Sequence, residues 1–116
     1  MPSQEFVKRK AELLDLLRRE RKITGEVRRL VIELYGERGR KAIEAVEGGR
    51  VIRSGRRWFV RGRGGVYEVV KNLCSCPDHV MNVVTGKAGV DMCYHALARL
   101  IAEITGEYRD EKGEGG

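Results

Sequence analysis

Residues 74–95 read CSCPDHVMNVVTGKAGVDMCYH, and this segment contains all three cysteines and both histidines of the chain. A CxC motif formed by Cys74 and Cys76 opens the segment, and a CxH motif formed by Cys93 and His95 closes it. Three thiolates and one imidazole are a ligand set that binds zinc tetrahedrally. The sequence therefore predicts one structural zinc ion per chain, because four protein ligands leave no open position for water or substrate.

The spacing within each motif restricts the backbone that can carry it. Residues i and i+2 of a β-strand point to the same face, roughly 6.6 Å apart, so strand geometry permits Cys74 and Cys76 to ligate one ion. In an α-helix the same positions lie about 200° apart, so the second motif cannot lie inside a regular helix. We therefore expect Cys93 at a helix start, where the helix dipole stabilises a thiolate and Asp91 acts as the cap.

Other interpretations of these residues stay open. Three cysteines are an odd number for a disulfide framework, and their position beside a histidine favours metal ligation in a reducing compartment. Ordinary buried cysteines and a core histidine are the alternative. His79 lies three residues after Cys76 and is the rival of His95 as the fourth ligand. If His79 does not bind the metal, it is expected at the surface or in contact with one of the metal-ligating residues.

The size and composition favour a small intracellular protein. With 116 residues the chain is long enough for one domain and too short for a two-domain enzyme with an interdomain cleft. The sequence has no apolar leader, and charged residues interrupt its N-terminal part, so we expect a cytoplasmic protein without a membrane span. Charged residues make up 34% of the chain, against one Gln and two Asn, a balance common in proteins from hot environments.

Positive charge is concentrated in the middle of the chain. Residues 37–63 hold nine basic and three acidic residues, a local charge of +6 that equals the net charge of the whole chain. Such a density attracts polyanions, so nucleic acid is a plausible partner and a solvated surface is the alternative. Trp58 or Tyr67 is a candidate for stacking on a base, although a core position is the alternative for Trp58. The expected nucleic-acid contacts are Arg53, Arg56, Arg57, Arg61 and Arg63.

Hydrophobic spacing predicts a helical hairpin in the N-terminal part of the chain. The first helix is expected over 4–21, and a second helix runs from Thr24 as the N-cap to Gly36 as the C-terminal cap. A shorter helix is expected over 40–47. A last helix should follow the CxH motif and end at Gly106.

From residue 50 onward the pattern changes to short apolar runs typical of strands. The runs cover 50–53, 57–61 and 66–71 and predict a three-stranded antiparallel meander. The glycine-rich residues 62–65 join two of these runs and do not open a helix, so a hairpin turn is favoured over a phosphate-binding loop.

The predicted fold class is α+β. It has a helical N-terminal region over 1–47 and a zinc-binding domain over 48–106, which contains the small sheet and the C-terminal helix. Residues 107–116 are charged and rich in glycine, so we expect a disordered tail there.

The chain resembles the SWIM-type zinc finger, a pattern of CxC, a variable gap and CxH that follows a short antiparallel sheet. The resemblance covers about residues 50–104, and every ligand position is filled. Tyr94 stands where many members have lysine, a departure that affects no ligand. The segments that carry the resemblance are Trp58-Phe59-Val60, Gly64-Gly65-Val66-Tyr67-Glu68-Val69, Cys74-Ser75-Cys76-Pro77 and Cys93-Tyr94-His95-Ala96-Leu97-Ala98.

Helices before a SWIM motif in a small archaeal-type protein are also similar to the SWIM subunits of Shu complexes. This resemblance implies a protein partner, a recombinase paralogue of the RecA family, and a role in DNA recombination and repair. Residues 1–47 contribute no comparably specific motif.

We expect a non-enzymatic binding module without a small-molecule substrate. A thiol nucleophile at Cys93 with His95 as its base would require an unmetallated pair, and the sequence shows no third group to orient that pair. Two binding surfaces are expected: the arginines for nucleic acid, and uncovered apolar stripes on the first two helices for a recombinase paralogue or a second copy of the chain. The alternative is a general nucleic-acid-binding or homo-oligomeric adaptor protein unrelated to recombination.

Overall fold

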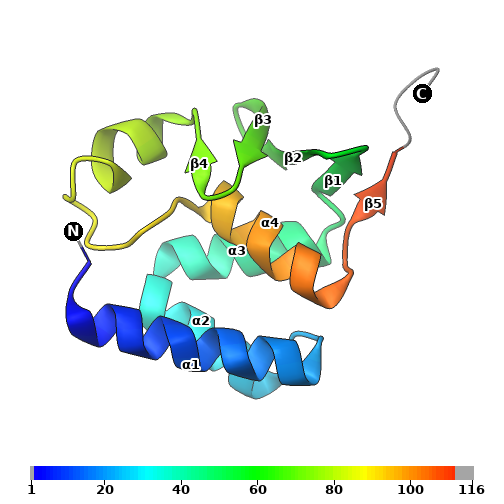
Figure 1. Ribbon diagram of the computed structural model, residues 1–116. Coiled ribbons are helices and arrows are strands. Elements are labelled where there is room, and N and C mark those ends of the chain that lie inside the picture. The colour runs from blue at the N-terminus through cyan, green and yellow to red at the C-terminus, as the bar shows by residue number, and fades with distance from the viewer. Residues whose placement is uncertain (1, 112–116) are drawn as a thin grey trace.

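The computed structural model of the protein describes residues 2–111 (Figure 1). The chain folds as an α+β protein in which helices come first, strands follow, and the longest C-terminal element is again a helix. The elements are α1 (Gln4–Glu20), α2 (Gly25–Tyr35), α3 (Glu37–Glu47), β1 (Val51–Ser54), β2 (Arg57–Gly62), β3 (Gly65–Val70), β4 (Leu73–Cys74), the π-helical segment η1 (His79–Val83), α4 (Tyr94–Thr105) and β5 (Arg109–Asp110).

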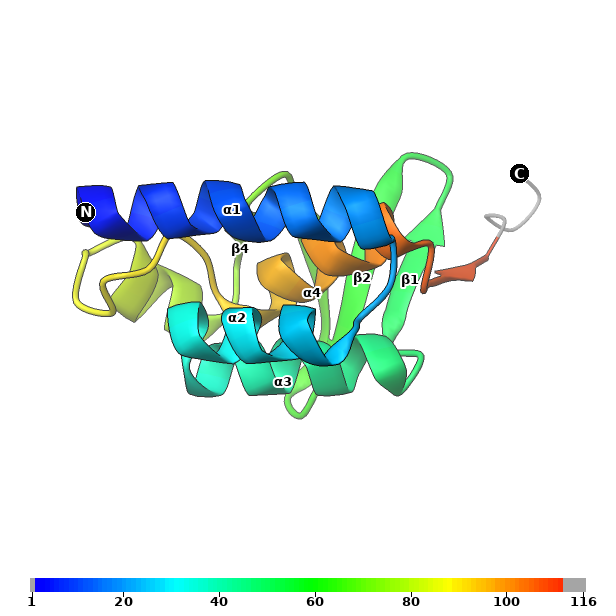
Figure 2. The same ribbon diagram turned by 90° about the horizontal axis from the view of Figure 1, so that it is seen from below.

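The elements lie in three layers. Figure 1 shows the sheet above α3 and α4, and the pair α1 and α2 below them. Seen from below in Figure 2, α1 and α2 run antiparallel, which confirms the predicted helical hairpin. The middle layer therefore contacts both outer layers, and α4 packs directly on the strands. None of the helices within residues 2–111 combines the length and the apolar character that crossing a membrane requires.

Local signals in the sequence account for the helix ends. The Thr24 hydroxyl accepts a hydrogen bond of 3.1 Å from the backbone N–H of Val27, so it caps α2 as predicted. Gly36 ends α2 with a φ of 63°, and Gly106 ends α4 with a φ of 80°, both in the region that favours glycine.

The third helix is longer than predicted. It begins at Glu37 rather than at residue 40, directly after Gly36, and it contains Gly39. This start has no local signal, because no side chain caps this end among the described residues. Gly39 is there for packing: a Cβ atom at this position would lie 2.5 Å from the carbonyl oxygen of Val31, so glycine lets α3 approach the backbone of α2.

The sheet is larger than the predicted meander and is not purely antiparallel. Its five strands have the order β4-β3-β2-β1-β5. The three predicted strands pair antiparallel, with Val60 of β2 opposite Val51 of β1 and Tyr67 of β3. The expected strand count and the purely antiparallel pairing are wrong, because β4 adds an antiparallel edge and β5 pairs parallel to β1.

The outer strands are too short to be predicted. Both β4 and β5 have two residues, and β5 lies in the segment 107–116 that was expected to be disordered. The backbone N–H of Glu111 donates to the carbonyl of Arg53, which continues the pairing. The prediction of disorder is therefore wrong for Arg109 and Asp110, and residues 112–116 lie outside the described residues.

One cluster of buried side chains joins the helical N-terminal region to the sheet. It includes Leu17 of α1, Val31 of α2, Ile43 of α3, Val60 of β2 and Ile101 of α4, each with 1% exposure or less. The predicted division into a region over 1–47 and a domain over 48–106 stays a prediction. In the structure, residues of both parts belong to this one core.

Candidate metal centre

The structure brings the four predicted ligand residues together. Cys74, Cys76, Cys93 and His95 are all buried, and one potential ligand atom from each lies within 4.8 Å of the others. The Nδ1 atom of His95 is 3.9 Å from the Sγ atom of Cys74 and 3.8 Å from that of Cys93. This Cys₃His group can hold one metal ion.

These distances match the geometry of a tetrahedral site. Bonds of roughly 2.3 Å to sulfur and 2.0 Å to nitrogen place a sulfur and a nitrogen about 3.5 Å apart around a zinc ion. The observed separations of 3.8 Å and 3.9 Å differ from that value by only a few tenths of an ångström. Three soft sulfur donors and one imidazole also favour zinc over the hard cations, which prefer oxygen.

Three different local structures hold the ligands. Cys74 ends the short edge strand β4, opposite Val69 of β3. Cys76 lies beyond that strand, where its Sγ atom accepts a hydrogen bond of 3.4 Å from the backbone N–H of His79. The strand geometry that permits this spacing is therefore not the one used, because β4 ends at Cys74 and the chain turns toward η1.

The second motif opens α4 as predicted. Cys93 is the N-cap residue, with extended backbone at φ −81° and ψ 177°, and its carbonyl accepts the first helical hydrogen bond from Leu97 at 3.0 Å. His95 lies in the first turn of α4. A thiolate at this position lies at the positive end of the helix dipole.

Asp91 does not cap α4, contrary to the sequence prediction. No side-chain hydrogen bond caps this helix among the described residues, and the carboxylate of Asp91 binds elsewhere. It accepts a hydrogen bond of 2.8 Å from the Tyr35 hydroxyl and forms an ion pair with Lys10. The loop before Cys93 is thereby tied to both helices of the N-terminal hairpin.

The imidazole of His95 is fixed by aromatic rings and by a glycine. Its ring centroid lies 4.8 Å from that of Tyr67 and 4.0 Å from that of Tyr94. Its Nε2 atom is buried without a hydrogen-bond partner among residues 2–111. A Cβ atom at Gly62 would lie 2.5 Å from this Nε2 atom, so only glycine leaves room for the ring. The ring is thus confined with Nδ1 toward the cysteines.

An ion pair anchors the first ligand loop to α3. Arg38 donates two hydrogen bonds to the Asp78 carboxylate, at 2.8 Å and 2.7 Å, and Asn82 donates a third at 2.9 Å. These hydrogen bonds, first of all those from Arg38, lower the pKa of Asp78. Asp78 lies two residues after Cys76, so this pair positions the CxC motif. Nothing in the sequence indicated this partner, which comes from 40 residues earlier in the chain.

His79 is buried and is not part of the four-residue group. The alternative of a surface position for this residue is wrong. Its backbone N–H contacts the sulfur of Cys76, whereas its Nδ1 atom has no hydrogen-bond partner in the described part of the chain.

The three thiols compete for ionisation when no metal ion holds them. Hydrogen bonding to Cys93, and also to His95, lowers the pKa of Cys74. The same hydrogen bond, together with burial, raises the pKa of Cys93, and burial raises the pKa of Cys76. A divalent cation removes this conflict because cysteines bind metals as thiolates.

The five predicted arginines do not form one uniform surface. Arg53 pairs with Asp110 at 3.0 Å and lies over the ring of Tyr108, and Arg57 donates two hydrogen bonds to Glu68. Charges that are already paired within the protein are less available to an external anion. The other three form no ion pair within residues 2–111, and these are Arg56, Arg61 and Arg63.

The two aromatic candidates for base stacking have partners within the protein. Trp58 is half-buried and makes an edge-on contact with Tyr108, with ring centroids 4.9 Å apart. Tyr67 contacts His95. The alternative of a packed position for Trp58 fits these contacts better than a stacking role.

Exposed apolar side chains lie elsewhere than expected. Among the described residues, α1 and α2 expose only Val7 and Ile32 as large apolar side chains. Six other large apolar side chains with more than half of their surface exposed lie in β3, β4 and around η1, and we call them the 66–84 surface. They are Val66, Val70, Leu73, Val80, Met81 and Val84.

Comparisons with known proteins identify no relative. No family model matches the chain, no curated protein matches its sequence, and no solved structure matches its fold. The resemblance to the SWIM-type zinc finger therefore rests on the residues of the motifs themselves.

Proposed function

We propose that this chain is a non-enzymatic binding module whose fold is stabilised by one zinc ion. The observation that carries the proposal is the burial of three cysteines and one histidine whose ligand atoms lie within 4.8 Å of one another. Four protein ligands close the tetrahedron, so the ion would have a structural role. Elemental analysis of protein purified without chelators tests this proposal. One zinc ion per chain is expected, and protein without metal or with two ions would contradict it.

We further propose that the module acts in DNA recombination and repair, by binding a RecA-family recombinase paralogue, DNA or both. The resemblance of the motifs to SWIM-type proteins supports this role. The six exposed apolar side chains of the 66–84 surface support a protein partner, because large apolar side chains exposed to solvent are buried when a partner binds. The unpaired cations support nucleic acid.

An affinity pull-down from the native cell, with and without nuclease, tests this finer proposal. A recombinase paralogue that stays bound after nuclease treatment would support direct protein binding. Loss of every partner after nuclease treatment would support DNA as the bridge. A general nucleic-acid-binding or homo-oligomeric adaptor is the runner-up, and it predicts recovery of unrelated nucleic-acid proteins or of the chain itself.

A further inference from the structure

A cavity among the described residues lies beside the metal centre. It has a volume of about 550 Å³ and is open to solvent on one side. Cys76 and His95 line it, together with residues of α3 and of the turn between β2 and β3. Volumes in this range accommodate a group as large as a nucleotide.

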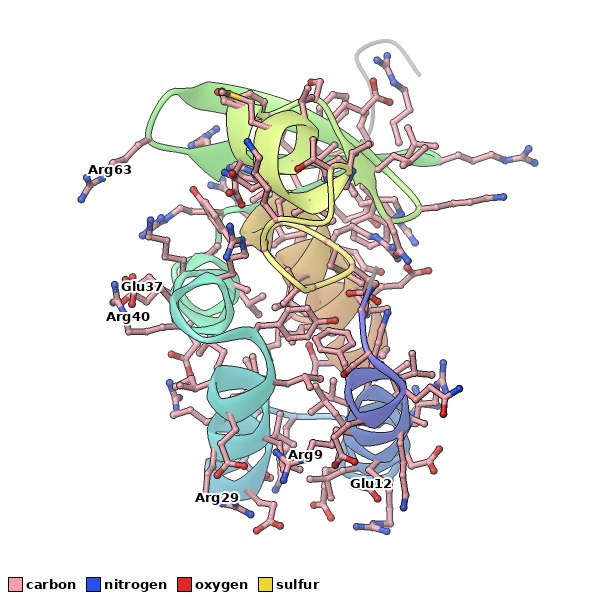
Figure 3. All side chains as sticks on the ribbon, turned by 90° about the vertical axis from the view of Figure 1, so that its left-hand side faces the viewer. Arg9, Glu12, Arg29, Glu37, Arg40 and Arg63 are labelled. Atoms are coloured by element: carbon pink, nitrogen blue, oxygen red, sulfur yellow. The ribbon has the colours of Figure 1, made fainter. Side chains whose placement is uncertain are left out.

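Three cations from separate segments surround this cavity. They are Lys41 of α3, Arg50 between α3 and β1, and Arg63 of the turn between β2 and β3. Within residues 2–111 none of the three forms an ion pair, and all three are exposed. Figure 3 shows Arg63 extending outward on the same side of the molecule as Arg40 of α3.

The acidic residues at the cavity have partners of their own. Glu37 and Glu44 share Arg40 as their partner, and Asp78 pairs with Arg38. One carboxylate charge is left over beside Lys41, Arg50 and Arg63, so five cations against three carboxylates leave a net charge of +2 around the cavity.

Two phenol groups add neutral hydrogen-bond donors. Tyr67 and Tyr94 both line the cavity, and the Nζ atom of Lys41 lies 5.8 Å from the ring centroid of Tyr94. Three cations and two hydroxyl donors around one cavity suit a tetrahedral oxyanion.

Positive charge is also present outside the cavity. Arg56 and Arg61 form no ion pair within residues 2–111, and they are not among the residues that line the cavity. Cations at more than one place fit a polyanion better than one isolated anion.

We propose that this cavity binds a backbone phosphate of a nucleic-acid strand through Lys41, Arg50 and Arg63, with hydrogen bonds from Tyr67 and Tyr94. The proposal deepens the nucleic-acid branch of the proposed function. It differs from the sequence prediction because Arg53 and Arg57 are occupied within the protein, whereas Lys41 and Arg50 were not among the predicted contacts.

The test compares two triple variants of the zinc-loaded protein that lose the same charge. The cavity variant carries Lys41→Gln, Arg50→Gln and Arg63→Gln. The control variant carries Lys8→Gln, Arg18→Gln and Lys22→Gln, which are exposed cations without ion pairs in the described residues, in α1 or just after it. Fluorescence anisotropy with a labelled single-stranded DNA of mixed sequence is measured across a salt series.

The cavity variant should raise the Kd at least tenfold, and the control variant less than threefold. Three lost phosphate contacts should also reduce the slope of log K against log salt by about 2, since each contact on a single strand contributes about 0.7. The single variant Tyr94→Phe keeps the ring against His95 and removes the hydroxyl, so it should raise the Kd several-fold with the zinc content unchanged.

Four results would overturn the proposal. Equal loss of binding in the two triple variants would mean attraction to net charge alone. Loss of zinc from the cavity variant would mean that the cations only balance the thiolates. Saturable binding of ATP without binding of DNA would mean a small phosphate ligand. A zinc-loaded parent protein that does not bind DNA at low salt would refute the phosphate site and leave the zinc-stabilised module intact.

Discussion

Replacing Gly62 by alanine should expel His95 from the metal centre. The new Cβ atom would lie 2.5 Å from Nε2 of His95 and 2.8 Å from the hydroxyl oxygen of Tyr94. An unstrained contact needs about 3.5 Å, so the imidazole would have to move by about 1 Å. On its other side the ring faces the sulfurs of Cys74 and Cys93, at 3.9 Å and 3.8 Å from Nδ1. A shift of that size exceeds the tolerance of about 0.2 Å for a metal–ligand bond.

We expect the zinc Kd of Gly62→Ala to rise at least about 100-fold, which corresponds to about 2.7 kcal/mol. Competition with a chromophoric zinc chelator measures this change, and the absorption spectrum of the cobalt-substituted protein reports whether the nitrogen ligand is lost. Gly25→Ala is the matched control, because no atom lies within 4 Å of its added Cβ at the start of α2. The control should bind zinc as the parent does and be as stable or slightly more stable. A parent-like zinc Kd in Gly62→Ala would refute the argument from ring confinement.

Three further predictions concern the loops around the centre. Cys93→Ser should abolish stoichiometric zinc binding and the protection of backbone amides in α4 against hydrogen exchange. The control Ser75→Ala, at an exposed position, should retain both. A protected α4 in metal-free Cys93→Ser would contradict the coupling between metal binding and folding. Because Arg38 lowers the pKa of Asp78, that carboxylate contributes stability above its unfolded pKa of about 3.9 and loses it as the pH falls further. Arg38→Gln should therefore cost about 1 to 2 kcal/mol at pH 7 and flatten this acid dependence in denaturant titrations, and an unchanged pH profile would exclude the role of the pair. Tyr35→Phe should cost about 1 kcal/mol in the same titrations, and no loss would mean that its hydrogen bond to the loop before Cys93 is dispensable.

Helices were predictable where a single side chain or glycine fixes an end. Thr24 and Gly36 mark the limits of α2 because capping and positive φ are local properties of the chain. The start of α3 was missed since no side chain caps it, and the reason for Gly39 lies in its contact with α2. Tertiary contacts of this kind leave no local pattern in a sequence.

The four ligand residues could be selected from the sequence because cysteine and histidine are rare and their chemistry is specific. The residues that hold these four in place could not be selected from the sequence. Arg38, Asp91 and Gly62 act through partners that are distant in the chain, and each is a common residue in an unremarkable context. Similarly, the count of positive charges singled out residues 37–63 but could not separate Arg57, which is paired, from Arg63, which forms no ion pair within residues 2–111.

The order of the ligands along the chain has a consequence for biosynthesis. Cys76 and Cys93 are separated by sixteen residues, and ribosomes add about 5 to 20 residues per second, so the second motif follows the first after roughly 1 to 3 seconds. During that interval the nascent chain carries Cys74 and Cys76, which are two of the four residues of the group. It still lacks α4 and the other two residues, which lie at the start of that helix. A metal ion can therefore bind all four residues of the group only after the start of α4 has been made, and until then the two thiols of the first motif are open to oxidation.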